Sequence, residues 1–137
     1  MRDRKKALER LLAVKTRMGE LEEARLAEIE RQKVKAQEDW RAMLGFLDDV
    51  AEKDALLLSL ACRRVAAAER GAAALEAQAA QQKQVVLRRH AQKRGVEKLL
   101  KETSSALERE DEKRRLLDLG ERLAGNAPRK PGLSSDF

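Results

Sequence analysis

The spacing of apolar residues in a chain without early proline most constrains this fold. The first proline is Pro128, so no residue before it interrupts the backbone hydrogen bonds of a helix. Over the first 47 residues, apolar side chains recur mostly at every third or fourth position, as on one face of a helix. They stand at positions 8, 11, 14, 18, 21, 26, 29, 36, 40, 43 and 47. The longer step near 22–26 predicts a shift from heptad toward 11-residue phasing.

The composition favours long helices over a compact globule. Charged residues make up 39% of the 137 residues and aromatic residues 2%, so few large side chains are available to fill a globular core. A charged chain rich in Ala, Leu, Glu and Arg is typical of coiled coils. Disorder is the other class with so much charge, but leucine at helical spacing argues against it. We therefore predict an all-α fold.

A second, longer helix is predicted over 50–124. Its apolar seam can be followed through 14 positions, of which ten are apolar. The positions are 61, 65, 68, 72, 75, 79, 82, 86, 89, 93, 96, 100, 103 and 107. Ser105 and Glu108 have the spacing of a capping box, so a kink or break near 103–105 is an alternative.

The stretch 45-GFLDD-49 predicts a turn between the helices. Gly45 can end a helix, Phe46 can fold back on its last turn, and Asp49 with Glu52 has capping-box spacing. In the alternative, the first helix continues to Lys53 and Asp54 caps the next. The prediction is an elongated antiparallel two-helix coiled-coil hairpin with a longer C-terminal helix. It comprises one unit over 1–125, with a helix over 3–44, a turn over 45–49, a helix over 50–124 and a disordered tail over 126–137.

A turn centred near residue 47 leaves the second helix longer than the first. Residue 3 would lie beside residue 91, so residues 92–124 would have no partner within the chain. That stretch carries exposed leucines, which favour association. Three arrangements could cover them: a homodimer through this stretch, a fold back after a break at 103–105, or docking onto another protein.

The sequence offers no arrangement typical of an enzyme or a cofactor site. His90 and Cys62 are single residues 28 positions apart, and no glycine-rich phosphate loop occurs. We expect no enzymatic activity, no metal and no cofactor. A basic stretch over 83–101 leaves sequence-nonspecific nucleic-acid binding as an alternative, although no aromatic residue is interleaved to stack on bases. Its basic residues are Lys83, Arg88, Arg89, Lys93, Arg94, Lys98 and Lys101.

The chain lacks the marks of a targeting or membrane-spanning segment. Its first 15 residues are charged throughout, and its uncharged runs fall short of the roughly 18 residues that span a bilayer. We expect a cytoplasmic protein. Trp40, the one large aromatic residue, is expected to pack against the start of the second helix, or to be a hot spot for protein binding beside the turn.

The C-terminal stretch 97-EKLLKETSSALEREDEKRRLLDLGERLAG-125 resembles the charged ending of the FliJ family of flagellar type III export and its injectisome sibling, the YscO family. The matching residues are Glu108, Glu112, Lys113 and Asp118, followed by Arg122. The basic first helix, the short turn and the longer second helix are also similar to that family. The resemblance implies a two-helix stalk similar to the central rotor subunit of rotary ATPases.

The resemblance also implies partners and sites. Family members insert the end that carries both termini into the export ATPase ring, touch the export gate at the membrane, and in some cases escort export chaperones. The implied ATPase-binding residues are Leu8, Leu11, Leu12, Leu116, Leu119, Arg122 and Leu123. The implied gate-binding or chaperone-binding residues are Trp40, Leu44, Leu57, Leu60 and Arg64. A generic cytosolic coiled-coil scaffold that homodimerises through its C-terminal helix is the alternative.

Overall fold

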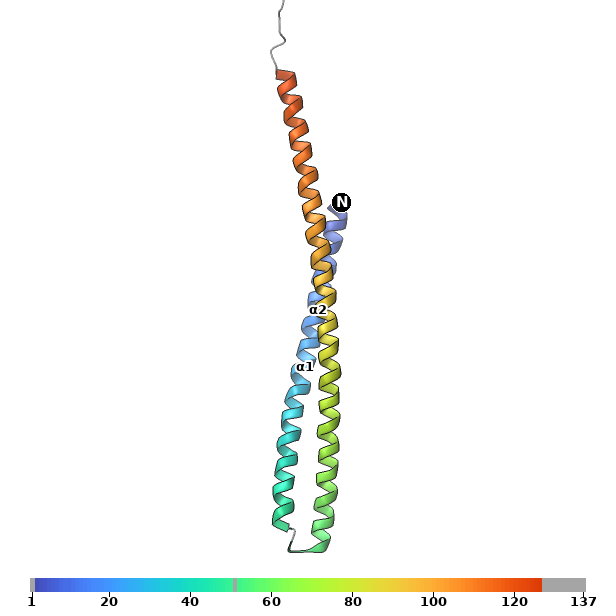
Figure 1. The fold of residues 1–137 in the computed structure, drawn as a ribbon, viewed down its shortest axis with the longest axis vertical. Helices are drawn as coiled ribbons and strands as arrows, with labels where there is room; N and C mark the ends of the chain where they lie inside the picture. Colours follow the sequence, from blue (N-terminus) through green and yellow to red (C-terminus); the bar gives the residue numbers. More distant parts are fainter. Residues whose placement is uncertain (1, 51, 127–137) are drawn as a thin grey trace, which may run out of the picture. The chain divides into compact units, whose positions relative to one another are not determined.

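The structure, a computed structural model, describes residues 2–50 and 52–126. These residues form two helices, α1 (Arg2–Val50) and α2 (Ala55–Asn126), which pack against each other as an antiparallel hairpin (Figure 1). The predicted all-α hairpin with a longer C-terminal helix is confirmed. Of the tail predicted over 126–137, only Asn126 is described, as the last residue of α2, and the rest lies outside the described residues.

The pairing of α1 with α2 is divided over two compact units, whereas the sequence was interpreted as a single unit over 1–125. Unit 1 comprises the described residues up to Leu11 and from Val96 onward, and unit 2 comprises Leu12–Gly95. Unit 2 therefore contains the turn of the hairpin. Unit 1 contains the start of α1 and the C-terminal part of α2.

The turn lies later in the chain than predicted. Residues 45–49 are helical, so the prediction of a turn there is wrong, and α1 continues to Val50. Asp54 caps the second helix, because its Oδ1 accepts a hydrogen bond from the Leu56 backbone N–H at 2.9 Å. The alternative in which the first helix runs on and Asp54 is the cap is therefore the better description. Gly45 permits a turn but does not impose one, since glycine also tolerates helical geometry.

The seam predicted for α2 is confirmed. Each of its 14 positions from Ala61 to Leu107 is buried or half-buried. The helix also runs without interruption through 103–105, so the predicted alternative of a break there is wrong. Thr103 is buried in the seam, and the capping-box spacing of Ser105 and Glu108 is not used to start a new helix.

The seam of α1 differs from the prediction. Apart from a few flanking half-buried residues such as Leu44, the seam positions of α1 alternate by three and four and are all buried or half-buried, so the phase shift predicted near 22–26 is wrong. They lie at positions 5, 8, 12, 15, 19, 22, 26, 29, 33, 36, 40, 43, 47 and 50. Leu11, Val14 and Leu21 are exposed, and Gly19 and Glu22 stand in the seam instead. The regular seam of α2 requires an equally regular α1, even where α1 presents polar residues.

Hydrogen bonds within unit 2 set the register of α1 against α2 where the seam contains polar residues. The Gln82 side-chain amide donates to the backbone carbonyl of Glu22 at 2.9 Å and to its carboxylate at 2.5 Å. Beside this pair, His90 Nε2 lies 2.7 Å from Glu23 Oε1. A partly buried polar pair of this kind disfavours shifted alignments, because each shift leaves buried polar groups without partners.

Candidate functional site

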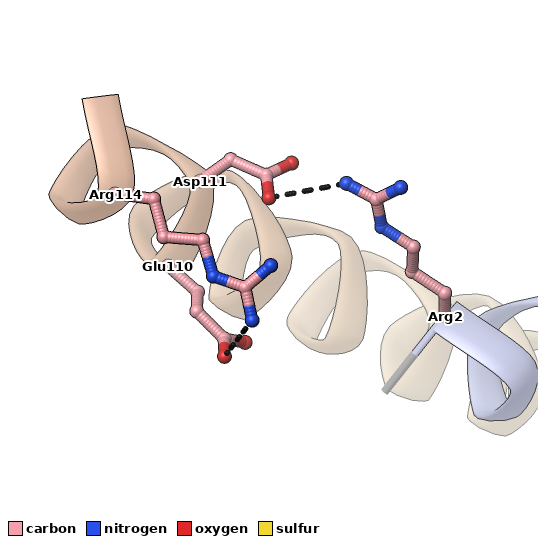
Figure 2. Close-up of polar contacts among 4 residues, drawn as sticks. All are labelled: Arg2, Glu110, Asp111 and Arg114. Atoms are coloured by element: carbon pink, nitrogen blue, oxygen red, sulfur yellow. Dashed lines mark hydrogen bonds and ion pairs between the residues drawn. The ribbon is translucent and has the colours of Figure 1, made fainter. Parts of the chain in front are cut away.

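The last cross-helix contact at the start of α1 defines where the candidate site begins. Arg2 Nη2 lies 3.3 Å from Asp111 Oδ1 and joins the first described turn of α1 to α2 (Figure 2). Leu107, one turn earlier in α2, is buried. Arg114 pairs instead with Glu110 of its own helix, at 3.4 Å. The intramolecular cover of α2 in unit 1 therefore ends near Asp111.

The uncovered part of α2 is shorter than predicted. Because the turn lies after Val50, α1 reaches Asp111 rather than residue 91, and the prediction that 92–124 has no partner is wrong. We call residues 112–126 the extension. At about 1.5 Å per residue, it is about 22 Å long. The fold-back arrangement is wrong because α2 has no break at 103–105, and the homodimer and docking arrangements considered for 92–124 concern only this segment.

The extension presents a dense group of apolar side chains. Every side chain described from Glu112 to Gly125 is exposed. Leu116, Leu117, Leu119 and Leu123 are 62%, 68%, 52% and 64% exposed. Single exposed leucines are ordinary on protein surfaces, but four within eight residues of one helix mark a surface for association.

Three of these leucines lie on a different side of α2 from the hairpin seam. The seam positions of unit 1, which end at Leu107, continue by heptad spacing to residues 110, 114, 117 and 121. Only Leu117 is a large apolar residue among them. Leu116, Leu119 and Leu123, which we call the leucine stripe, fall on the outer side of the helix. α1 and a partner on the leucine stripe would therefore use different sides of α2.

The N-terminal leucines implied as ATPase-binding residues are only partly available. Leu8 and Leu12 are half-buried at seam positions of α1, whereas Leu11 is 41% exposed. Leu8 therefore belongs mainly to the packing of unit 1, and Leu12 to that of unit 2. Arg122 is exposed next to Leu123 in the extension. The structure thus leaves the C-terminal members of the predicted set open, together with Leu11.

The second predicted site lies near the turn, within unit 2. Trp40 and Leu44 are half-buried, whereas Leu57, Leu60 and Arg64 are exposed. A surface groove of ≈ 310 Å³ opens here between the two helices. Its lining residues are Asp39, Ala42, Met43, Phe46, Ala61 and Arg64.

The sequence predictions missed two exposed apolar residues near the turn. Phe46 was expected to fold back on the end of the first helix, but it is helical and 52% exposed. Leu56, two residues after the cap Asp54, is 69% exposed. The signal that could have found Leu56 is the run 56-LLL-58, because only one side of a helix can face its partner. Trp40 itself holds its indole N–H buried and without a hydrogen-bond partner.

The charged groups of the described residues lie mainly on exposed surfaces. The guanidinium of Arg31 donates to the Glu28 carboxylate and lowers the pKa of Glu28 below its ordinary value. In the basic stretch 83–101, Arg89 and Lys93 are half-buried at seam positions, so they are not part of an open basic face. Among the described residues, no group of three His, Cys, Asp or Glu side chains is placed to hold a metal ion.

Neither α1 nor α2 contains a stretch, among the described residues, that is long and apolar enough to cross a membrane. Comparisons of the chain with protein-family models, with curated proteins and with solved structures found no match.

Proposed function

We propose that this protein is a non-enzymatic stalk and adaptor of the flagellar type III protein export apparatus. In this proposal it binds the export ATPase ring through its extension, and an export gate protein or export chaperones through the surface near its turn. It would act in the cytoplasm, at the membrane only through these partners. The resemblance of the C-terminal stretch to the FliJ and YscO families suggests the machine, and the exposed extension suggests the docking element.

One observation carries the proposal: α2 continues beyond its last ion pair with α1 and keeps its leucines exposed. Arg2 and Asp111 end the intramolecular cover, and Leu116, Leu119 and Leu123 follow within about three turns. Fully burying a leucine is worth about 1.5–3 kcal/mol. An element built this way is suited to enter a cavity of another protein, because it projects apolar side chains without giving up its own packing.

Capture of the export ATPase by the full-length chain tests this function. The wild-type protein is expected to retain the purified ATPase, and the double variant Leu116→Asp/Leu123→Asp is expected to lose it by at least about tenfold. Two buried leucines of ordinary worth exceed the 1.4 kcal/mol that corresponds to a tenfold change. The binding is measured by pull-down and by titration calorimetry.

A matched control separates docking from general damage. Leu87 is also an exposed leucine of α2, at 58%, but it lies in unit 2. Leu87→Asp should leave ATPase capture unchanged, and circular dichroism should show equal helicity for all variants. Unchanged capture by the Leu116→Asp/Leu123→Asp variant would refute the assignment of the extension as the docking element.

The surface near the turn provides the second contact of the proposed adaptor. Phe46 and Arg64 line its groove, and Leu57 and Leu60 are exposed in the first turns of α2. Leu57→Asp/Leu60→Asp is expected to weaken capture of the export gate protein or chaperone and to leave ATPase capture intact. The reverse pattern would exchange the two assignments.

The alternative function, a scaffold that homodimerises through the C-terminal helix, is supported by the same exposed leucines. Analytical ultracentrifugation distinguishes the two functions. The stalk is expected to be a monomer at micromolar concentration. A stable dimer that dissociates when Leu116 and Leu123 are replaced by Asp would favour the scaffold.

A further inference from the structure

The leucine stripe has the spacing of a coiled-coil interface of its own. Leu116, Leu119 and Leu123 are separated by three and four residues, so they occupy successive a, d and a positions of a heptad. This register is out of phase with the hairpin seam that ends at Leu107. Going toward the N-terminus, the same register places Glu112 and Arg109 at d and a, so the apolar stripe begins at Leu116.

The residues that flank the stripe are basic. In the register of the leucine stripe, Lys113 and Gly120 occupy e positions, and Arg115 and Arg122 occupy g positions. Two of the three acidic residues of the extension, Asp118 and Glu121, fall at c and f, on the side away from the stripe, and the third, Glu112, occupies the d position just before Leu116. All of these side chains are exposed. An approaching helix would therefore meet leucines whose e and g positions carry three cations and no anion, with Glu112 at the N-terminal end of the stripe.

This charge pattern disfavours a second copy of the same chain as the occupant. In a parallel homodimer, each d position faces the same d position of the other copy, so Glu112 would meet Glu112 directly beside Leu116. In an antiparallel homodimer, g positions face g positions, so arginine would meet arginine. Both orientations juxtapose like charges, which destabilise a helix pair.

We infer that the leucine stripe binds an amphipathic helix of another protein whose apolar face is flanked by Asp or Glu. The inference deepens the proposed function, because it assumes that the extension is the docking element and specifies the chemistry of its partner. Leucine spacing supplies the apolar contact, and Lys113, Arg115 and Arg122 select partners by charge. The partner leaves α1 in place, since the stripe and the hairpin seam lie on different sides of α2.

A membrane surface fits the same residues less well. Residues 112–126 contain four basic and three acidic side chains, so their net charge is +1. Helices that lie on anionic membranes instead carry a strongly basic polar face and often Trp or Phe on the apolar face. The extension contains neither Trp nor Phe.

Two synthetic peptides of three heptads, used with the full-length protein, test the inference. Both have Leu at every a and d position; one has Glu at all e and g positions, and the other has Lys there. Fluorescence anisotropy should show that the wild-type protein binds the Glu peptide about three- to tenfold more tightly, from three flanking ion pairs of modest strength. The preference should decrease as salt is added.

Charge-reversed variants provide the decisive comparison. Lys113→Glu/Arg115→Glu/Arg122→Glu should reverse the preference in favour of the Lys peptide. Arg94→Glu/Lys98→Glu/Lys101→Glu changes the net charge equally at exposed positions outside the extension and should keep the wild-type preference. Leu116→Asp/Leu123→Asp should abolish binding of both peptides.

Four results would overturn the inference. These are equal binding of both peptides, no binding of either, a stripe-dependent dimer in sedimentation, and stripe-dependent binding to phosphatidylglycerol vesicles without peptide discrimination. The inference and the proposed function fail separately. If the ATPase is captured but the charge reversal changes nothing, the function stands and the inference falls. If peptide selection holds but the ATPase is not captured, the function falls.

Discussion

Two stretches of α2 in unit 1 carry leucines at helical spacing, yet only one of them is covered. Over 96–107, Leu100 and Leu107 occupy the hairpin seam and are half-buried or buried. Over 112–126, Leu116, Leu119 and Leu123 occupy the outer side of the same helix and are exposed. The helix between them is uninterrupted, so the apolar pattern changes phase without any change of backbone conformation. In the described part of α2, this phase change coincides with the end of the contact with α1.

The leucines of the two stretches also differ in what they contribute to the stability of the folded chain. A leucine at the seam stabilises the folded chain, because α1 removes it from water. A leucine of the extension contributes to the folded chain only through helix propensity. Its side chain stays exposed in the described structure, so substitutions in the two stretches should affect different measurements.

The largest expected contrast is between Leu107→Ala and Leu116→Ala. Leu107→Ala should lower the free energy of unfolding by about 2 kcal/mol, the lower end for a buried leucine, because Leu107 is covered by only one helix. Leu116→Ala should change it by no more than about 0.5 kcal/mol. Urea denaturation followed by circular dichroism, with hydrogen exchange of the amides over 100–107, measures both. Equal losses would show that the extension is covered within the monomer.

A second contrast tests how closely α1 approaches the seam in unit 2. Ala79 is 2% exposed, whereas its neighbour Ala80 is exposed. Ala79→Leu should force the helices apart and destabilise the chain by about 1–3 kcal/mol. Ala80→Leu adds the same atoms on the outer side and should change stability by no more than about 0.5 kcal/mol. Thermal unfolding checks the pair, and an unaffected melting temperature in Ala79→Leu would contradict a close seam.

The smallest expected effects on stability come from substituting two glycines, one buried and one exposed. Gly19 is buried in the seam, and a Cβ added there meets no heavy atom within 4 Å; Gly120 in the extension has the same space but is exposed. Gly19→Ala should stabilise the chain by about 0.5–1 kcal/mol, through helix propensity and reduced freedom of the unfolded chain. Gly120→Ala should raise helicity without moving the midpoint of the main transition. A lower midpoint for Gly19→Ala would mean that the seam needs this glycine.

Much of α2 could be predicted from the sequence, whereas much of α1 could not. The seam of α2 could be followed throughout because ten of its fourteen positions from Ala61 to Leu107 are apolar, and Gln82, Arg89, Lys93 and Thr103 keep the same spacing. In α1, Leu11, Val14 and Leu21 extend the apolar pattern away from the true seam, and Gly19 and Glu22 interrupt it. A seam assigned from the apolar residues of α1 alone therefore predicts a phase shift that the helix does not have.

The candidate sites were predictable to different degrees. The sequence predicted the leucines of the extension as an association surface, because several leucines close together at the end of a helix are expected to be buried by some partner. The roles implied for Leu8 and Leu12 were less complete, because both residues are half-buried at seam positions of α1. A shift of a few residues at the turn changes every pairing along the hairpin.

The sequence by itself determined that this chain is helical almost throughout, that its second helix is the longer one, and that its C-terminal leucines form a stripe. These properties follow from local spacing and from the absence of proline before Pro128. Tertiary structure decided where the first helix stops, which polar residues enter its seam, and which leucines remain exposed. Gly45, Asp49 and Asp54 all carry cap or turn signals, and local spacing alone does not choose among them. Their order was set by the register that lets two regular seams pack together over the length of α1.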